Sequence, residues 1–438
     1  MKIYHAADIH LGRRRLDGRL PDTDLANAFE HIVRAAIADR ADVFLIAGDL
    51  FDRPQVEPPH LRQAQRMLAL LKDAGIPVVA IEGNHDKAFL SFSAPTWLDY
   101  LAHDELLHIL RPTFDSTGAG LSPWDAQSRR GSYIDLDGVR FVGAGYLGAA
   151  TPNKVRQIME KLQPGRSHVL LLHAGPDYFV GEGGGFSGSD LHFIRERVRY
   201  LALGHIHKPM IHGGWACNPG SPENCDLREA LYDCDAAGGA VRRGYAVIEL
   251  NPNDLTQPVS IEVRSNPRRP CIHLELECTP FGNKLKDGAA ALEKAALKLI
   301  KAANSSSDAV VDLRLTGRIN LDRINLDLEA SSRAIETGAS VAAVHINPAG
   351  INLNSFAVGS IECGDFVSRE EIERSAIRQL VDDDHLWGLD GQQGSVAALF
   401  YELKEAVRQR RTAEELAEII RINPLLEKVR IARAIPEP

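Results

Sequence analysis

Hydrophobic residues recur with two different periods over the first ninety residues. Apolar positions spaced three and four apart predict helices over 25–37 and 61–71. Short apolar runs between them predict strands over 2–7, 43–47 and 77–81. The run over 43–47 has no polar position, which is typical of a strand buried on both faces. This β-α-β-α-β order implies parallel strands joined by right-handed crossovers.

The middle of the chain is richer in strands. Segments over 132–136 and 139–143 flank Asp137-Gly138, a dipeptide typical of a hairpin turn. Further strands are predicted over 169–172, 200–203 and 245–250. The pattern breaks over 251–270, where four prolines interrupt it, so we place a domain boundary near residue 265.

The remainder of the chain has a different pattern. Alternation over 272–277 and 309–315, on either side of a helical pattern over 289–303, predicts a small α+β domain. We therefore expect three parts, which are residues 1–265, 266–365 and 366–438. The last part is predicted to be helical, because Ser368 with Glu371 and Thr412 with Glu415 form capping-box patterns.

The composition is ordinary for a globular protein. The chain has 438 residues, of which 44% are hydrophobic and 25% charged, and this excludes dominant disorder and a disulfide-stapled miniprotein. No apolar run approaches the ~18–20 residues that a membrane span needs, and the first residues do not resemble a signal peptide. We expect a cytoplasmic protein with no membrane partner. Without a C-x-x-C pair, the six cysteines are interpreted as reduced thiols rather than a zinc site.

Residues of the types that bind metals follow five of the predicted strands. They are Asp8 and His10 after the first strand, Asp49 after the second, Asn84 after the third, His173 after residues 169–172, and His205 and His207 after residues 200–203. Ligands of open α/β sheets bind outside the carboxyl ends of the strands. We therefore expect all seven side chains to meet at one edge.

The number and type of these residues indicate two metal ions. Seven ligands exceed what one octahedral ion needs, whereas two metals that share one carboxylate can use them all. Asp49 stands at the centre of the series and is the expected bridge. Four imidazoles favour manganese, iron or zinc over the oxygen-preferring magnesium and calcium. Two divalent cations carry a charge of +4 and the two carboxylates supply −2, so the site keeps about +2. This charge is neutralised by one hydroxide and one phosphodiester anion.

His85 follows Asn84 directly and is a candidate catalytic group. An imidazole beside a bound phosphate can protonate a leaving alkoxide or stabilise charge in the transition state. Asp86 or Asp52 is expected to orient this imidazole. Taken alone, Gly83-Asn84-His85-Asp86 could be a turn, but in combination with the other motifs it predicts catalysis.

These residues together resemble a known family. The motifs are Asp8-x-His10, Gly48-Asp49-x-x-Asp52, Gly83-Asn84-His85-Asp86, His173 and Gly204-His205-x-His207. The series resembles the calcineurin-like metallophosphoesterase superfamily. Within it the chain resembles the SbcD/Mre-type DNA repair exonucleases, because Gly48-Asp49-Leu50-Phe51-Asp52 and Asn218-Pro219-Gly220-Ser221-Pro222-Glu223 are close to that branch. The resemblance by motif covers residues 1–250, and beyond them it is architectural.

The resemblance implies a fold and a set of site residues. The fold is an α/β metallophosphoesterase β-sandwich flanked by helices, with a smaller α+β capping domain and a helical C-terminal segment. One metal would be held by Asp8, His10, Asp49 and His207, and the other by Asp49, Asn84, His173 and His205. Members typically prefer manganese. His85 matches the catalytic histidine, and Asp52 stands where some members have a second one.

The resemblance also implies a function and partners. We expect a two-metal DNA nuclease, both exonuclease and single-strand endonuclease, that acts in DNA repair or end processing. A metal-activated hydroxide would attack phosphorus while His85 assists the leaving oxygen. The implied partners are DNA, an SMC-like ATPase of the SbcC type and a second copy of the chain. The apolar stripe over 396–407 either packs on its own domain or docks on that ATPase.

Two segments near these motifs have alternative interpretations. Arg13, Arg14, Arg15 and Arg19 either contact phosphates of a DNA strand or form a solvated basic loop. Such contacts would let a chain of net charge −9 bind DNA through a local field. The glycine-rich segment 181–188 is either a plain connection or a loop whose Phe186 stacks on a base.

Two other functions stay open at this point. The first is another calcineurin-like phosphoesterase, either a phosphomonoesterase or a cyclic-nucleotide phosphodiesterase. The large C-terminal extension, and Asp86 where protein phosphatases usually have Glu, count against it. The second is a non-catalytic subunit of an ATPase complex, and the presence of every ligand and of His85 counts against that.

Overall fold

The computed structural model of the chain divides into two compact units. It describes residues 1–87, 95–180, 184–234, 239–281, 288–303, 306–317, 327–351, 393–409 and 411–423. The first unit comprises Met1–Leu276, Leu292–Leu315 and Asp327–Pro348, and the second comprises Glu277–Ala291, Thr316–Leu326 and Ala349–Pro438. The expected boundaries near 265 and 365 stay predictions. The capping pattern at Ser368 and Glu371 lies outside the described residues.

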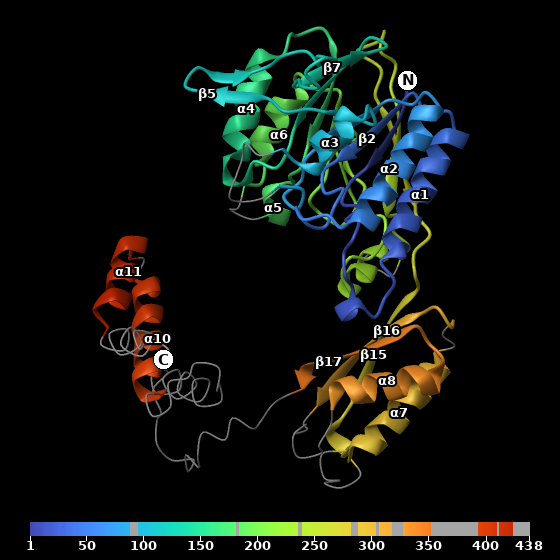
Figure 1. Cartoon of the computed structure of the whole chain (residues 1–438), viewed down its shortest axis with the longest axis vertical. Coiled ribbons are helices and arrows are strands. Elements are labelled where there is room, and N and C mark those ends of the chain that lie inside the picture. The colour runs from blue at the N-terminus through green and yellow to red at the C-terminus, as the bar shows by residue number, and fades with distance from the viewer. Residues whose placement is uncertain are drawn as a thin grey trace, which may run out of the picture. The chain divides into compact units, whose positions relative to one another are not determined.

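The first sheet, in which Figure 1 labels β2, has six strands in the order β14-β13-β1-β2-β3-β4. They are β14 (Ser260–Ser265), β13 (Gly244–Glu249), β1 (Lys2–Ala6), β2 (Val43–Ala47), β3 (Val78–Ile81) and β4 (His108–Ile109). Strands β1 to β4 are parallel, and β13 is antiparallel to both β1 and β14. Helices α1 (Thr23–Ala38) and α2 (Pro58–Asp73) connect the first three strands, and α3 (Trp97–His103) precedes β4. The predicted β-α-β-α-β order is confirmed.

The second sheet also has six strands, in the order β11-β12-β10-β9-β8-β7. They are β11 (Met210–His212), β12 (Ala216–Asn218), β10 (Tyr200–Leu203), β9 (Ser167–Leu172), β8 (Val139–Ala144) and β7 (Tyr133–Leu136). Strands β8, β9, β10 and β12 are parallel. The predicted hairpin joins β7 and β8, and both Asp137 and Gly138 adopt the positive φ that such a turn requires.

The two sheets pack face to face and helices cover their outer faces. Val43 and Leu45 of β2 lie in the core between the sheets, together with Phe141 of the second sheet. Phe44 and Ile46 point the other way and pack on the side of α1 and α2. Successive side chains of a strand point to opposite faces, so a strand between two apolar layers has no polar position. This accounts for the continuous apolar run and confirms the helix-flanked β-sandwich.

Helices α4 (Thr151–Lys161) and α6 (Gly188–Arg195) pack on the outer face of the second sheet. Phe186 is fully buried in that apolar layer. Its ring is therefore unable to stack on a base, and that hypothesis for the glycine-rich segment is wrong. Residues 181–183 of the segment lie outside the described part of the chain. The short helix α5 (Asp177–Val180) comes before them, and a small ribbon of β5 (Thr113–Asp115) and β6 (Gly118–Gly120) precedes α4 in sequence.

A third, three-stranded sheet follows in the predicted α+β region. Its order is β15 (Cys271–Glu277), β16 (Val310–Gly317) and β17 (Ala343–Ile351). Helices α7 (Gly288–Ala302) and α8 (Leu328–Ala339) accompany it. Within the first unit, Arg19 joins this region to the sandwich through Glu336, with Nη1 2.7 Å from Oε1. The strand-helix-strand pattern predicted for this region is confirmed.

The C-terminal helices of the second unit are α10 (Gln393–Arg408) and α11 (Ala413–Ile422). The predicted capping box at the start of α11 is present, since Thr412 Oγ1 accepts from the Glu415 N–H and Glu415 accepts from the Thr412 N–H. On α10, Val396 is buried whereas Val407 is 61% exposed. Among the helices that the structure describes, none is both long and apolar enough to cross a membrane.

Arg243 is the largest fully buried side chain of the described residues and holds together the loops beyond β12. Its guanidinium donates to Asp233 Oδ1 at 2.9 Å, to Ser221 Oγ at 2.7 Å, and to Asn224. Removing a buried cation leaves the carboxylate and the other acceptors without their partner, which costs more than the loss of an exposed pair.

We expect Arg243→Ala to lower the free energy of unfolding by about 3–5 kcal/mol. The control is the neighbouring Arg242→Ala, which removes only an exposed pair with Glu262 and should cost less than about 1 kcal/mol. Urea unfolding followed by circular dichroism measures both variants. Equal losses would contradict the structural role assigned to Arg243.

Candidate metal centre

The seven predicted ligands lie just beyond the carboxyl ends of β1, β2, β3, β9 and β10. A continuous chain of contacts links them across both sheets. The contacts are Asp8 Oδ1 to His205 N at 2.9 Å, His205 Nδ1 to Asn84 Oδ1 at 3.0 Å, Asn84 Oδ1 to His173 Nε2 at 3.1 Å, His173 Nε2 to Asp49 Oδ2 at 3.1 Å, Asp49 Oδ2 to His10 Nε2 at 3.6 Å, and His10 Nε2 to His207 Nε2 at 3.1 Å. The structure thus brings together residues that are up to 199 positions apart.

Asp49 lies at the centre of this cluster. Its Oδ2 faces His10 on one side and His173 on the other, while its Oδ1 accepts the main-chain N–H of His85 at 2.9 Å. The side chain is almost fully buried. The carboxylate is therefore positioned between the two groups of ligands that were expected to hold separate ions.

The backbone adopts strained conformations at this edge. Four of the seven predicted ligands have a left-handed φ, namely Asp8 at 54°, His10 at 51°, Asp49 at 52° and His205 at 84°. Such values are uncommon for residues with a side chain, and they concentrate at functional sites where the surrounding structure imposes them.

Glycines next to the ligands permit the close approach. A Cβ on Gly83 would lie 1.9 Å from Asp49 Oδ1, and one on Gly48 would lie 2.2 Å from His173 Nδ1. Gly48 also has a φ of +93°, which favours glycine. The glycines of the motifs therefore make room for the ligands rather than simply forming turns.

Hydrogen bonds from Nδ1 orient three of the imidazoles. His173 Nδ1 donates to Ala47 O at 2.8 Å, His207 Nδ1 donates to Glu229 Oε1 at 2.6 Å, and His85 Nδ1 donates to Asp52 O at 2.8 Å. A proton held on Nδ1 leaves the lone pair of Nε2 free to act as an acceptor or a metal ligand.

The charges of the cluster favour a bound cation. Burial alone would lower the pKa of His173, but the adjacent Asp49 carboxylate outweighs burial and raises this pKa to about 9. The buried Oδ2 of Asp8 has no hydrogen-bond partner within the described part of the chain. Burying a carboxylate oxygen without a partner is costly, and a cation removes that cost. The oxygen and imidazole set thus fits two divalent metals of the manganese, iron or zinc type.

His85 lies against this cluster, with its ring 4.8 Å from that of His10. The carbonyl of Asp52 orients it, whereas the carboxylate of Asp52 contacts Arg13 at 2.9 Å and His10 at 3.3 Å. Asp52 is one of the two residues expected to orient His85, and it does so through its main-chain carbonyl.

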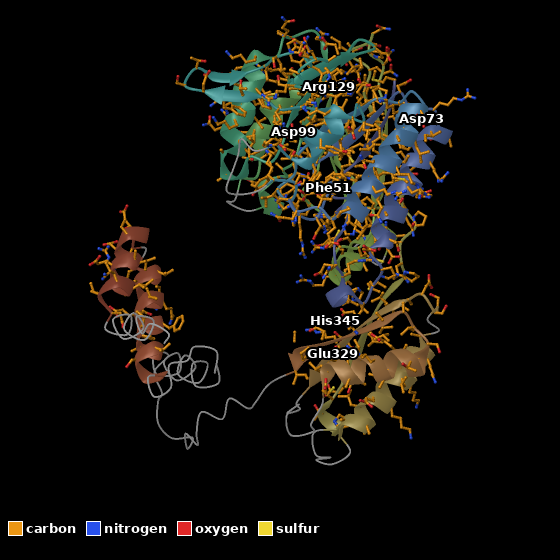
Figure 2. All side chains as sticks on the ribbon, in the orientation of Figure 1. Phe51, Asp73, Asp99, Arg129, Glu329 and His345 are labelled. Carbon is orange, nitrogen blue, oxygen red and sulfur yellow. The ribbon has the colours of Figure 1, made fainter. Side chains whose placement is uncertain are left out.

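Asp86 has a different position from the one expected beside His85. Its carboxylate accepts hydrogen bonds from the main-chain N–H groups of Phe51, at 3.0 Å, and of Gly83, at 2.9 Å. Figure 2 labels Phe51. Burial and the charge of Asp49 raise the pKa of Asp86 to about 7. Asp86 ties the loop after β2 to the loop after β3, so it positions ligands rather than the imidazole of His85.

Three of the four arginines predicted to contact DNA already have internal partners. Arg13 binds Asp52, Arg19 binds Glu336, and Arg15 is buried and binds Asp24. Arg14 is different, because 69% of its side chain is exposed and its nearest carboxylate, that of Glu57, is 3.7 Å away. The prediction of phosphate contacts therefore rests mainly on Arg14.

Sequence reasoning missed two residues that touch the cluster. Glu229 lies in the 3-10 helix η4 (Leu227–Asp233) and receives the hydrogen bond of His207. The thiol of Cys225 lies close to both His10 and His207. Neither residue follows a predicted strand, so no motif signalled them.

Comparison with known proteins identifies the region that holds this cluster. The family model described as calcineurin-like phosphoesterase matches residues 1–209. The chain is similar to the DNA double-strand break repair protein Mre11 of Archaeoglobus fulgidus, with 29% identity over 341 residues that cover 74% of this chain and 71% of the relative.

Two further proteins with the same description align over shorter regions. The one from Aeropyrum pernix is 32% identical over 219 residues, which cover 48% of this chain and 50% of the relative. The one from Methanopyrus kandleri is 28% identical over 275 residues, which cover 60% of this chain and 57% of the relative. The chain thus spans about half the length of these two relatives.

We expect Gly83→Ala to reduce the amount of metal that the protein retains by at least one ion per chain, because the new Cβ would displace Asp49. Manganese content after dialysis, measured by mass spectrometry, tests this. Gly188→Ala is the control, since nothing lies within 4 Å of a Cβ at that position. Full metal content in a folded Gly83→Ala protein would contradict the assigned geometry.

We expect Glu229→Gln to weaken metal binding about 10–100-fold, because it removes the carboxylate that orients His207. Calorimetric titration with manganese measures the affinity. Glu196→Gln, which alters an exposed Glu–His pair with His192, should leave the affinity unchanged. The role of Glu229 would be refuted if both variants bound manganese as the wild type does.

Proposed function

We propose that this chain is a two-metal DNA nuclease of the SbcD/Mre type, because residues 1–209 match the model of the calcineurin-like phosphoesterase family. It would act as an exonuclease and a single-strand endonuclease in DNA repair or end processing. The likeness to proteins described as DNA double-strand break repair protein Mre11 supports DNA as the substrate. The observation that carries the chemistry is the convergence of the seven predicted ligand side chains at one edge, where the carboxylate of Asp49 contacts both His10 and His173.

Two sets of side chains would hold the ions. Asp8, His10, Asp49 and His207 form one set, and Asp49, Asn84, His173 and His205 form the other. When bound, two divalent cations, which we propose to be manganese, supply Lewis acidity and an activated water for in-line displacement at phosphorus.

The residues of the chain would contribute binding and proton transfer. A cavity of about 600 Å³ is lined by His205, His207, Phe179 and Tyr232 and gives the substrate access to the ligand cluster. His85, with its Nδ1 proton fixed by the Asp52 carbonyl, would offer its other nitrogen to the leaving oxygen. The exposed Arg14 would contact a phosphate of the DNA strand, and it lines a second cavity of about 440 Å³.

The partners are also part of the proposal. An SMC-like ATPase of the SbcC type would dock on α10 and α11, where Phe400, Val407 and Ile422 are exposed. A homodimer and a cytoplasmic location complete the proposal. The alternatives, another phosphoesterase or a non-catalytic subunit, find less support because the similar proteins are described as DNA repair proteins and because the chain carries all seven predicted ligands and His85.

The test is cleavage of end-labelled single- and double-stranded DNA with manganese, magnesium or EDTA. We expect manganese-dependent shortening that EDTA abolishes, because the ligand cluster needs its ions. We expect His85→Ala to lower the rate by about 10²–10⁴-fold while both metals stay bound, since His85 acts by proton transfer.

His192→Ala is the matched control, because its imidazole is 82% exposed on α6. It should cleave DNA as the wild type does. No cleavage of DNA together with rapid turnover of a phosphomonoester or a cyclic nucleotide would refute the nuclease and favour another phosphoesterase. Bound metals without activity on any substrate, even with the ATPase added, would favour the non-catalytic subunit.

A further inference from the structure

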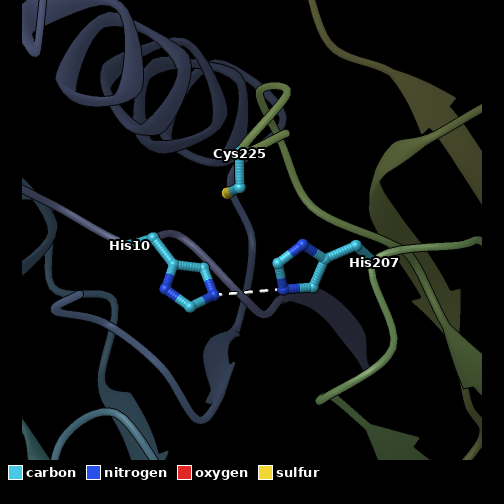
Figure 3. A group of neighbouring side chains, drawn as sticks. All are labelled: His10, His207 and Cys225. Carbon is cyan, nitrogen blue, oxygen red and sulfur yellow. Dashed lines mark hydrogen bonds between the residues drawn. The ribbon is translucent and has the colours of Figure 1, made fainter. Parts of the chain in front are cut away.

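Besides the loops of His10 and His207, the loop that carries Cys225 also reaches the metal edge. Cys225 belongs to none of the motifs described above. Figure 3 shows Cys225, His10 and His207 side by side, and the three come from separate loops. One ligand atom of each residue lies within 4.8 Å of the ligand atoms of the other two. His10 Nε2 and His207 Nε2 are only 3.1 Å apart, so both imidazoles point a nitrogen at the same place.

The main chain holds Cys225 firmly in this position. Its N–H donates to Glu229 Oε2 at 3.0 Å, and its carbonyl accepts from Arg13 Nε at 2.9 Å. Both partners also belong to the cluster, since Glu229 orients His207 and Arg13 binds the carboxylate of Asp52. The thiol, whose sulfur lies 3.8 Å from the Glu223 carbonyl oxygen, is therefore held close to the two imidazoles, unlike a cysteine that fills an apolar core.

An independent observation indicates a cation at this place. Asp8 is fully buried, and its Oδ2 has no hydrogen-bond partner within the described part of the chain. Oxygen atoms of Asp8 and Asp49 and a nitrogen of His10 also lie within 4.8 Å of one another. His10 belongs to both this group and the group of His207 and Cys225, so a divalent ion that it holds would satisfy the Asp8 carboxylate beside the imidazole that faces the sulfur.

We propose that Cys225 is a further protein ligand at the metal position of His10 and His207, and that its sulfur makes this position prefer thiophilic cations such as zinc or cobalt over manganese. The proposal rests on the two-metal site of the proposed function and departs from it only in the ion expected at this one position. On binding, the sulfur–metal bond forms, the thiol proton passes to solvent, and one water leaves the ion. Thiolate and imidazole ligands select zinc and related ions, whereas manganese favours oxygen ligands.

The test is cobalt binding to the full-length protein, followed by absorption spectroscopy. We expect the wild type to show a sulfur-to-cobalt charge-transfer band in the near ultraviolet. Cys225→Ser and Cys225→Ala should lose this band and keep the visible cobalt bands that report imidazole and carboxylate ligands. The control is Cys234→Ser, which replaces an exposed cysteine and should retain the charge-transfer band.

Affinity provides a second readout. In competition with a chromogenic chelator, Cys225→Ala should bind zinc about 10–100-fold more weakly, while its manganese affinity changes less than about 3-fold. A charge-transfer band that is absent from the wild type or that persists in Cys225→Ser would overturn the proposal. An equal loss of zinc and manganese affinity would do so as well.

X-ray absorption at the zinc edge of the wild type needs no variant. It should show a sulfur neighbour at about 2.3 Å, and its absence overturns the proposal even if the Cys225 variants do not fold. None of these readouts depends on DNA cleavage. A protein with the sulfur signature and no cleavage refutes the nuclease alone, and a nuclease without the signature refutes the sulfur ligand alone.

Discussion

The rest of the structure depends on the contacts that surround the buried carboxylate of Asp49. A charged group inside a protein is tolerated only when charges or hydrogen bonds surround it. Here the surroundings are supplied by His10 from the loop after β1, His173 from the end of β9, and the His85 N–H from the loop after β3. These segments belong to two different sheets, so the carboxylate requires the two sheets to end at the same edge.

The packing of the sandwich meets this requirement. Apolar side chains such as Val43 and Phe141 fill the space between the sheets and fix the ends of the parallel strands relative to one another. The loops beyond those ends are strained, because Asp8, His10, Asp49 and His205 adopt left-handed φ values. The stability of the core thus maintains the strained geometry of the site.

A second layer of polar contacts connects the site to the fold. Glu229 accepts from His207 and also from Ser221, and Ser221 in turn accepts from the buried Arg243. The side chain that orients a predicted ligand is therefore fixed by the same network that stabilises the loops beyond β12. Such outer contacts determine which nitrogen of an imidazole faces the metal. They also bring Cys225 beside the imidazoles, because its N–H donates to Glu229.

The sequence by itself determined the elements and the set of candidate ligands. Periodicity predicted β2 and α1, because a strand or helix shows its buried face in local spacing. The seven candidates were recognisable because each follows a strand, and the ends of parallel strands lie at one edge. The tertiary structure alone decided the roles that depend on distant partners. Asp86 binds main-chain groups, Phe186 is buried, Arg15 pairs internally, and Cys225 reaches His207. Such contacts join residues far apart along the chain, and no local pattern encodes the packing that brings them together.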